Sequence, residues 1–532
     1  MQAGLGGGVV GNIGKWTLVA VLCGAACAKG RTDDRQSGVV GPSDSGSGTD
    51  AGTPDPGPGD AGVPDGGPVD AGPTAVKPVF GTPGPWPIAN VTYGSAEGIQ
   101  ESPVVGVSTD EPVRQADGKI TQNLWVATNS ALYVMRPGDT KFTRFDGNDG
   151  LHLPGFPAAS CDDSTGKLAP CPLGEAAPPG INEIVGGGSG NGYDGEVFVG
   201  YYAYHDWSPT DGTLQDSARH SGKVDRVRLK ADSSGKLSLE VVRLDMVSNN
   251  TVQFWHNKTV FKMVYDHFIH AHELYVGCDH GVTKISPDKW KPSVGWFLSA
   301  DQQQVWMSDH LHPRACFHQV CTGDSNLRLA DWRGLGIDAN GDLWVAGRYA
   351  ASRIHYVADN TIWWQTPRPD GTIANDPSFG DPYDGNCSGN RPIFCAPLEG
   401  DPVNLSAVAP APDGRVWFAS GILFNEPGDV NYGIAVWQPH GPFTYYDPVR
   451  DAGMAEANVR DMLLLPDGRL VLAGPNSGLT FWDPATGKHA SIRAGQGIPD
   501  DRILRIQLDT MVDPPALQVA TRGGATVLRV LP

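Results

Sequence analysis

Histidines are distributed unevenly along this chain, and they are the residues best suited to bind a metal. Of the 14 histidines, eight lie between positions 256 and 318. Neutral imidazoles together with a carboxylate bind zinc, copper and other divalent ions. Five of the residues in and near this segment are expected to lie at the same end of the folded domain: His256, His280, His310, His312 and Asp279. They define a candidate divalent-metal site; the alternative is that they are separate loop residues, hydrogen-bonded or exposed.

Other motifs that could carry chemistry fail on their spacing. HELYV (272–276) begins like the HExxH motif of metalloproteases, but its fifth residue is Val276 and its pattern is that of a strand. DANGD (338–342) resembles the start of a calcium loop without the later Glu. Phosphate-loop, dinucleotide and Gly-x-Ser-x-Gly motifs are missing from the sequence. We therefore expect no catalytic residues, and a protein that is not an enzyme.

The composition indicates a turn-rich, acidic protein. The chain has 532 residues, of which 69 are Gly and 44 are Pro, while charged residues make up only 19%. Frequent Gly and Pro argue against a helical protein. The net charge of −19 excludes nucleic acid as a partner, because phosphate binding requires a clustered basic surface.

The N-terminal residues 1–27 have the layout of a secretory signal. After Lys15 comes a short apolar run that is too short to span a bilayer and ends in small residues. GAAC (24–27) resembles the lipobox of bacterial lipoproteins, which implies cleavage before Cys27 and lipidation of this residue. The resemblance predicts an exported, membrane-anchored lipoprotein of a bacterial envelope, in the periplasm or at the outer membrane and cell surface. The alternative is an ordinary cleaved signal that releases a soluble protein.

The cysteines beyond the signal favour an oxidising compartment. Six of them form close pairs in Gly/Pro/Asp-rich stretches, which predicts disulfides that staple loops. The pairs are Cys161/Cys171, Cys316/Cys321 and Cys387/Cys395. A zinc site at CFHQVC (316–321) is the alternative for the second pair, although a second half at metal-finger spacing is missing. Cys278 remains, and we expect a buried thiol within a strand.

Residues 28–83 are of low complexity and contain DAG at positions 50, 60 and 70. Almost no apolar side chain is present there to offset the entropy of ordering the backbone. We expect a disordered, semi-extended tether, and residues 84–532 as the folded domain.

A short pattern with small and aromatic residues recurs through the rest of the chain. Its copies are NLWVAT (123–128), GEVFVG (195–200), HELYVG (272–277), GDLWVAG (341–347), GRVWFAS (414–420), GRLVLAG (468–474) and ALQVAT (516–521). A second apolar strand usually follows each copy, and Asp-Gly or Asn-Gly turns lie between strands. Short strands, hairpin turns and a repeated aromatic residue are typical of β-propeller blades.

The repetition has a physical reason. A four-stranded blade has two apolar faces and buries both only by packing against a blade on each side. We therefore expect the recurring aromatic residues to form the core between blades: Trp125, Phe198, Tyr275, Trp344 and Trp417. The fold class predicted is all-β, a single seven-bladed β-propeller, with six or eight blades as alternatives.

The units resemble the two-component-regulator type of propeller repeat, related to WD40 and YVTN propellers. VRDMLLLPDGRLVLAGPNSGLTFWD (459–483) carries the resemblance most fully. It implies the fold and leaves the activity open. The last unit lacks an outer strand, and IANVTYG (88–94) is placed to supply it and to close the ring.

The long insertions indicate a functional face. Mapped onto a propeller, 203–222, 286–325, 368–395 and 421–433 fall mostly at one end of the channel. We expect a non-catalytic binding scaffold, monomeric, which binds a protein, peptide or glycan at the cell envelope and contacts the membrane only through its lipid anchor. The alternative is a metal-dependent enzyme, similar to streptogramin-lyase-like or lactonase-like propellers, that uses the histidines at the channel mouth.

Overall fold

The structure is a computed structural model that describes part of the unit Pro73–Pro532. The described residues are 89–529 except 115–119, 152, 154–159, 163–167, 171–179, 189–192, 203–222, 246–259, 268–271, 279–281, 286–307, 312–331, 348–349, 357–361, 368–372, 377–404, 422–432, 442–443 and 513. The predicted signal (1–27), with Cys27, and the predicted tether (28–83) lie outside them. Lipidation, the tether and the domain boundaries therefore stay predictions.

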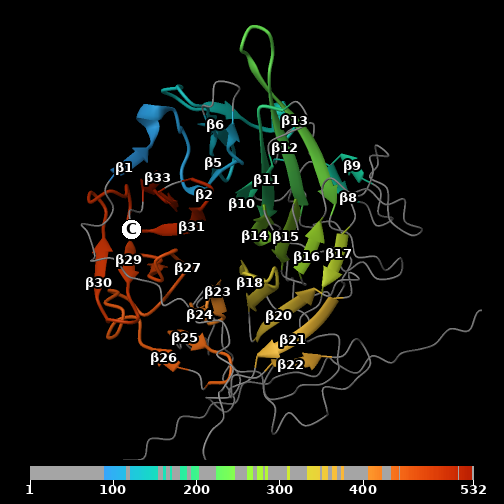
Figure 1. Ribbon diagram of the computed structural model, residues 1–532. Helices are drawn as coiled ribbons and strands as arrows, with labels where there is room; N and C mark the ends of the chain where they lie inside the picture. Colours follow the sequence, from blue (N-terminus) through green and yellow to red (C-terminus); the bar gives the residue numbers. More distant parts are fainter. Residues whose placement is uncertain are drawn as a thin grey trace, which may run out of the picture. The chain divides into compact units, whose positions relative to one another are not determined.

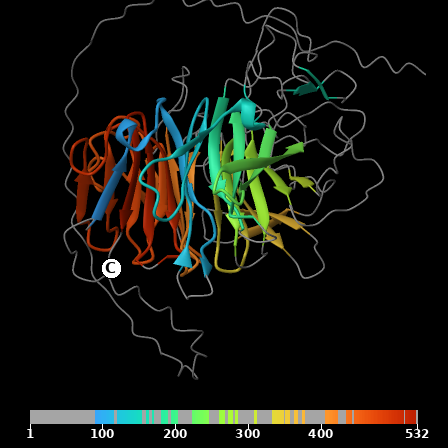
Figure 2. The same ribbon diagram turned by 90° about the horizontal axis from the view of Figure 1, so that it is seen from above.

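Seven antiparallel sheets are arranged around a central axis (Figure 1). Six contain four strands and one contains five. The first strand of each sheet contacts the first strand of the next, and β2 contacts β31, which closes the ring. Figure 2 shows the blades from the side, with their strands running along the axis. The predicted all-β, seven-bladed β-propeller is confirmed.

The blades are numbered along the chain from the innermost strand outward. Blade 1 contains β2 (Val104–Thr109), β5 (Leu124–Thr128), β6 (Leu132–Met135) and β7 (Thr143–Phe145). Blade 2 contains β10 (Gly180–Gly186), β11 (Gly195–Tyr202), β12 (Lys223–Ala231) and β13 (Leu237–Asp245). Blade 3 contains β14 (Val260–Asp266), β15 (Glu273–Cys278), β16 (Val282–Ile285) and β17 (Ser308–Leu311). Blade 4 contains β18 (Trp332–Ile337), β19 (Leu343–Gly347), β20 (Ala350–Tyr356), β21 (Ile362–Pro367) and β22 (Ile373–Asp376).

The remaining blades follow the same order. Blade 5 contains β23 (Leu405–Pro410), β24 (Val416–Ser420), β25 (Ile434–Trp437) and β26 (Thr444–Tyr446). Blade 6 contains β27 (Asp461–Leu464), β28 (Leu470–Ala473), β29 (Leu479–Trp482) and β30 (His489–Ile492). Blade 7 contains β31 (Ile503–Asp509), β32 (Ala516–Thr521), β33 (Gly524–Arg529) and β1 (Ala89–Tyr93). Outside the blades lie the short pairs β3 (Val113–Arg114) with β4 (Ile120–Thr121) and β8 (Ser160–Asp162) with β9 (Leu168–Pro170), and the 3-10 turns η1 (Ser95–Glu97) and η2 (Gly147–Asp149).

Blade 7 combines the two ends of the folded part of the chain. β1 pairs antiparallel with β33 and places Val91 opposite Val527. The blade's other three strands come from the last described residues, so this pairing joins the first described strand to the last. The predicted closure of the ring by 88–94 is confirmed for residues 89–93.

Hairpin turns in the repeats require glycine. Gly341, Gly414 and Gly468 adopt positive φ angles of 84°, 85° and 86° in the turns between the first and second strands of blades 4 to 6. These left-handed conformations are costly for residues with a Cβ atom. The recurring Asn-Gly and Asp-Gly pairs are therefore explained by the turns that they form.

The recurring aromatic residues form the core between blades. Trp125, Phe198 and Tyr275 are fully buried, and Trp344 and Trp417 are each 1% exposed. From blade 4, Trp344 packs against Phe418 and Trp437 of blade 5, with 5.4 Å between the ring centroids of the two tryptophans. The prediction that these residues are structural is confirmed. Cys278, a buried thiol in β15, is also placed as predicted.

The strand order assigns the connections to two ends of the channel. The connection face, as we name it, carries the links between second and third strands, such as 203–222, and between one blade and the next, such as 447–460. The hairpin face carries the turns between first and second strands and between third and fourth strands. Two expectations need correction. The insertion 286–325 is divided by strand β17, and the insertion 368–395 contains strand β22.

Candidate functional site

One level of the axial channel is built from an equivalent position in every blade. The innermost strands of all blades but the sixth contain a register shift near their start, which is a β-bulge. We call the position that follows it the ring position; in blade 6, which lacks the bulge, it is the residue opposite the small residue Ala473 of the second strand. In blades 1 to 7 it is occupied by Gly106, Glu183, Lys262, Gly334, Ala407, Asp461 and Arg505.

Each ring position lies opposite a small residue of the second strand. The partners, from blade 1 to blade 7, are Ala127, Gly200, Gly277, Ala346, Ala419, Ala473 and Ala520. Residues directly opposite in a sheet have their side chains on the same face. The small residue of the repeat therefore leaves space beside the ring position, and in four blades a charged side chain occupies that position.

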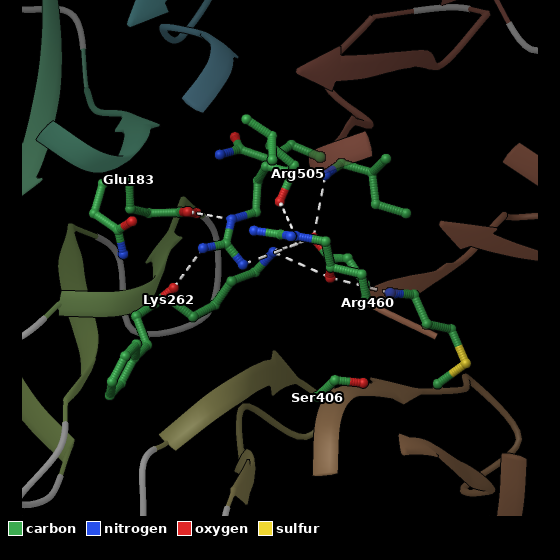
Figure 3. A network of polar contacts seen from close by, with 12 residues as sticks. Glu183, Lys262, Ser406, Arg460 and Arg505 are labelled. Carbon is green, nitrogen blue, oxygen red and sulfur yellow. Dashed lines mark hydrogen bonds and ion pairs between the residues drawn. The ribbon is translucent and has the colours of Figure 1, made fainter. Parts of the chain in front are cut away.

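The four charged ring residues form ion pairs with one another (Figure 3). The guanidinium of Arg505 contacts the carboxylate of Glu183, which connects blade 7 to blade 2. The ammonium of Lys262 lies 3.1 Å from Oδ2 of Asp461, which connects blade 3 to blade 6. Neither pair joins adjacent blades. The side chains therefore reach across the channel at this level.

Backbone groups hold the network in place. Asp461 accepts hydrogen bonds from Met462 N at 3.0 Å and from Ile506 N at 3.1 Å. Arg505 donates from Nη2 to Phe261 O at 2.6 Å, and its Nη1 lies 4.0 Å from Asp461 Oδ2. Fixed donors and acceptors of this kind orient both charged groups before any ligand arrives.

Burial controls the electrostatics of the network. Glu183 is fully buried, and burial raises its pKa, although the charges of Arg505 and Lys262 act in the opposite direction. Arg460 precedes β27, and burial together with the nearby charge of Arg505 lowers its pKa to about 10. Arg460 stays protonated at neutral pH at this pKa. Among the described residues at this level, Arg460, Lys262 and Arg505 therefore outnumber the carboxylates of Glu183 and Asp461.

The described residues use only part of the hydrogen-bonding capacity of Arg460. Its Nε donates to Leu504 O at 3.2 Å. In the part of the chain that the structure describes, no carboxylate oxygen lies within 4.0 Å of its guanidinium. Nearby, the guanidinium of Arg333 stacks 4.2 Å from the centroid of the Phe261 ring. Guanidinium groups arranged in this way bind carboxylates through paired hydrogen bonds.

The residues predicted to bind a metal are only partly placed. His310 lies in β17, the outer strand of blade 3, opposite Thr283, and not in a loop. His256, His280, His312 and Asp279 lie outside the described residues. Among the residues that are described, no group of three or more His, Cys, Asp or Glu side chains could hold a metal ion. The metal site stays a prediction.

The predicted disulfides also stay predictions. Cys161 belongs to β8, and the structure describes its backbone alone. The five partners, Cys171, Cys316, Cys321, Cys387 and Cys395, lie outside the described residues. No helix in the described ranges has the length and apolar character needed to cross a membrane.

Sequence reasoning missed the ring network, although a signal for it exists. Glu183, Lys262 and Arg505 are charged residues inside otherwise apolar strands, as INEIV, VFKMV and ILRIQ show. Each lies early in the strand that precedes the repeated small-and-aromatic segment. Aligning the repeats on their small residue would have placed these charges at one level of the channel.

Comparison with known proteins finds similarity only to solved structures, at low sequence identity. No protein-family model and no curated protein matches the chain. Among solved structures, a streptogramin B lyase is 8% identical with a TM-score of 0.40, covering 83% of this chain and 98% of its own. YCF48 from Cyanidioschyzon merolae is 10% identical with a TM-score of 0.41, covering 83% and 99%. Virginiamycin B lyase from Staphylococcus aureus, as its selenomethionine derivative, is 10% identical with a TM-score of 0.38, covering 84% and 99%.

Proposed function

We propose that this protein is an exported, lipid-anchored binding scaffold of a bacterial envelope. It binds a protein or peptide at the connection face, and an acidic group of the partner occupies the cationic end of the channel. Cys27 carries the lipid, and residues 28–83 give the propeller reach from the membrane. The observation that supports this proposal is the Arg460 guanidinium beside the buried ion pairs, for which the described residues supply an acceptor only to Nε.

The charges of the ring determine which ligand this end of the channel accepts. Asp461 already receives hydrogen bonds from two backbone amides and an ion pair from Lys262. A further cation would add to Arg460 and Arg505, which already repel each other. A carboxylate would instead form paired hydrogen bonds with Arg460 and lower that repulsion. The site therefore favours a glutamate, an aspartate or a free C-terminus of a peptide.

A peptide library with free C-termini tests this function. It is panned against the mature chain and against Arg460→Gln, with Arg450→Gln as the matched control. Arg450 belongs to the same connection before β27, and its side chain is 74% exposed. We expect enriched peptides to carry acidic residues or to bind through their C-terminus. Their affinity should fall at least about tenfold in Arg460→Gln and stay unchanged in Arg450→Gln.

Two results would overturn the proposal. One is the enrichment of neutral or basic peptides that bind Arg460→Gln as well as they bind the wild type. The other is an equal loss of affinity in both variants, which would assign the effect to net charge rather than to the channel. Circular dichroism of both variants establishes that they are folded.

A further inference from the structure

The half of the channel between the ring network and the hairpin face contains a cavity. Its volume is about 450 Å³, and it is lined by the second halves of innermost strands, from Lys262 at one end to Asp338 and Thr510 at the other. Sites for small molecules are typically concave, mostly apolar and of about this size. This cavity lies on the other side of the ion pairs from the proposed peptide site.

The walls of the cavity are apolar. Val264, Ile337, Leu464 and Leu508 line it, and each also packs against the core between two blades. These four side chains are partly rather than fully buried, although they belong to innermost strands. The channel is thus the space to which they remain accessible. An apolar ligand would cover them and gain about 25 cal/mol for each Å² removed from water.

The two ends of the cavity differ in charge. Lys262 lies at the end nearest the ring position, where it is paired with Asp461. At the hairpin end, Asp338 accepts hydrogen bonds from Asn340 N, Asp342 N and Trp344 Nε1. All three donors are neutral.

Asp509 is held in the same way at the hairpin end. It accepts hydrogen bonds from Thr109 Oγ1 and Gln122 Nε2, both at 2.7 Å, and from Met511 N at 2.8 Å. No Lys or Arg of the described ranges forms an ion pair with Asp338 or Asp509. His267 also lines the cavity, with its Nδ1 2.7 Å from Glu111 Oε1. The cavity therefore presents a mostly apolar interior and two carboxylates at its mouth.

We propose that this cavity is a second binding site, which accepts a linear alkylammonium group. The alkyl chain lies along the apolar walls, and the ammonium stays at the mouth beside Asp338 and Asp509. An alkyl carboxylate of the same length is repelled at the mouth, and a neutral alcohol gains only the apolar contacts. The site is separate from Arg460 and does not depend on the proposed peptide-binding function.

Titration calorimetry with hexylammonium, 1-hexanol and hexanoate tests the proposal on the mature chain at low salt. We expect hexylammonium to bind with a Kd at least about tenfold below that of hexanol, and hexanoate to bind more weakly than hexanol. Raising the ionic strength should weaken hexylammonium binding and leave hexanol binding unchanged. Equal affinities for the three compounds, or no binding of hexylammonium, would overturn the proposal.

Variants locate the binding within the channel. Asp509→Asn should raise the Kd for hexylammonium several-fold, while Asp413→Asn removes a carboxylate from a turn of the same face and should leave it unchanged. Val264→Phe and Leu464→Phe fill the cavity from two blades and should abolish binding. Two such variants are used so that one that fails to fold does not decide the result. Undiminished binding in a folded filling variant would overturn the site, whereas Arg460→Gln should bind hexylammonium like the wild type.

Discussion

Lys262 and Asp461 form an ion pair across the channel, with 3.1 Å between Nζ and Oδ2, although they are 199 positions apart in the chain. Their blades are not neighbours, and the contact therefore adds a connection that the ring of blade interfaces does not provide. Asp461 is 3% exposed and Lys262 is 11% exposed, so solvent screens the pair weakly.

Removing one partner of this pair should destabilise the protein strongly. Lys262→Met leaves the buried Asp461 carboxylate with only the more distant guanidinium of Arg505 as a paired cation, which should cost up to about 3–5 kcal/mol in the free energy of unfolding. Urea unfolding measures the change. The double variant Lys262→Met with Asp461→Asn should recover part of the loss, because no uncompensated charge remains. The control Lys230→Met removes a surface pair with Glu240 and should change stability little.

Asp110 should make stability depend on pH. Burial raises its pKa from 3.8 to about 7, although Asn123 and Trp125 donate hydrogen bonds to it. The folded state then binds a proton at Asp110 more tightly than the unfolded state does. The stabilisation that Asp110 contributes to the folded state is therefore complete below pH about 4 and disappears as the pH rises to about 7. The free energy of unfolding, measured across this pH range, should therefore contain a decrease with rising pH that is missing in Asp110→Asn. Identical slopes in wild type and variant would contradict the expectation.

The closing strand can be tested with proline. β1 pairs on one side only, so alternate backbone N–H groups point toward β33. Asn90→Pro and Val91→Pro should therefore differ, because only one of them removes a hydrogen bond of the ladder. The damaging variant should lose about 1–3 kcal/mol and the other considerably less. Unchanged stability in both variants would show that β1 does not contribute to ring closure.

Trp344 should be highly sensitive to truncation. It is 1% exposed, packs against blade 5 and donates from Nε1 to Asp338 Oδ2 at 3.0 Å. Trp344→Ala should cost about 3–5 kcal/mol. Tyr445→Ala removes a ring that is 44% exposed and serves as the control in the same unfolding experiment.

Metal analysis separates the proposed scaffold from a metal-dependent enzyme. For the scaffold we expect purified protein to contain no stoichiometric zinc, copper or other divalent ion. Stoichiometric metal that is lost in His280→Ala and His310→Ala would instead support the enzyme. Inductively coupled plasma mass spectrometry measures the content, and His489→Ala, in the outer strand of blade 6, is the control.

The fold could be predicted because each blade repeats the same physical requirement. Trp125 and Trp344 had to be buried between sheets, and Gly341 had to form a turn that other residues form at a cost. These requirements are local, so they recur as a sequence pattern in each repeat. The number of repeats predicted the number of blades, and the missing outer strand of the last repeat predicted the closure by residues near position 90. Strand β22 was missed because it lies inside a segment rich in turn residues.

The ring network could not be predicted in the same way. Glu183 and Arg505 are more than 300 positions apart, and their contact follows from the curvature of the ring rather than from any local pattern. A charged residue in an apolar strand signals a special position without identifying its partner. The histidines were grouped by proximity in sequence, and His310 shows the limit of that approach, since it belongs to an edge strand.

The ion pairs at the ring level have a consequence for how the molecule can work. Because they bridge the axis, they lie between Arg460 on one side and the cavity that begins at Lys262 on the other. Two ligands could therefore be bound at the same time without competing for space. Communication between them would have to pass through small shifts of the strands that carry Lys262 and Asp461.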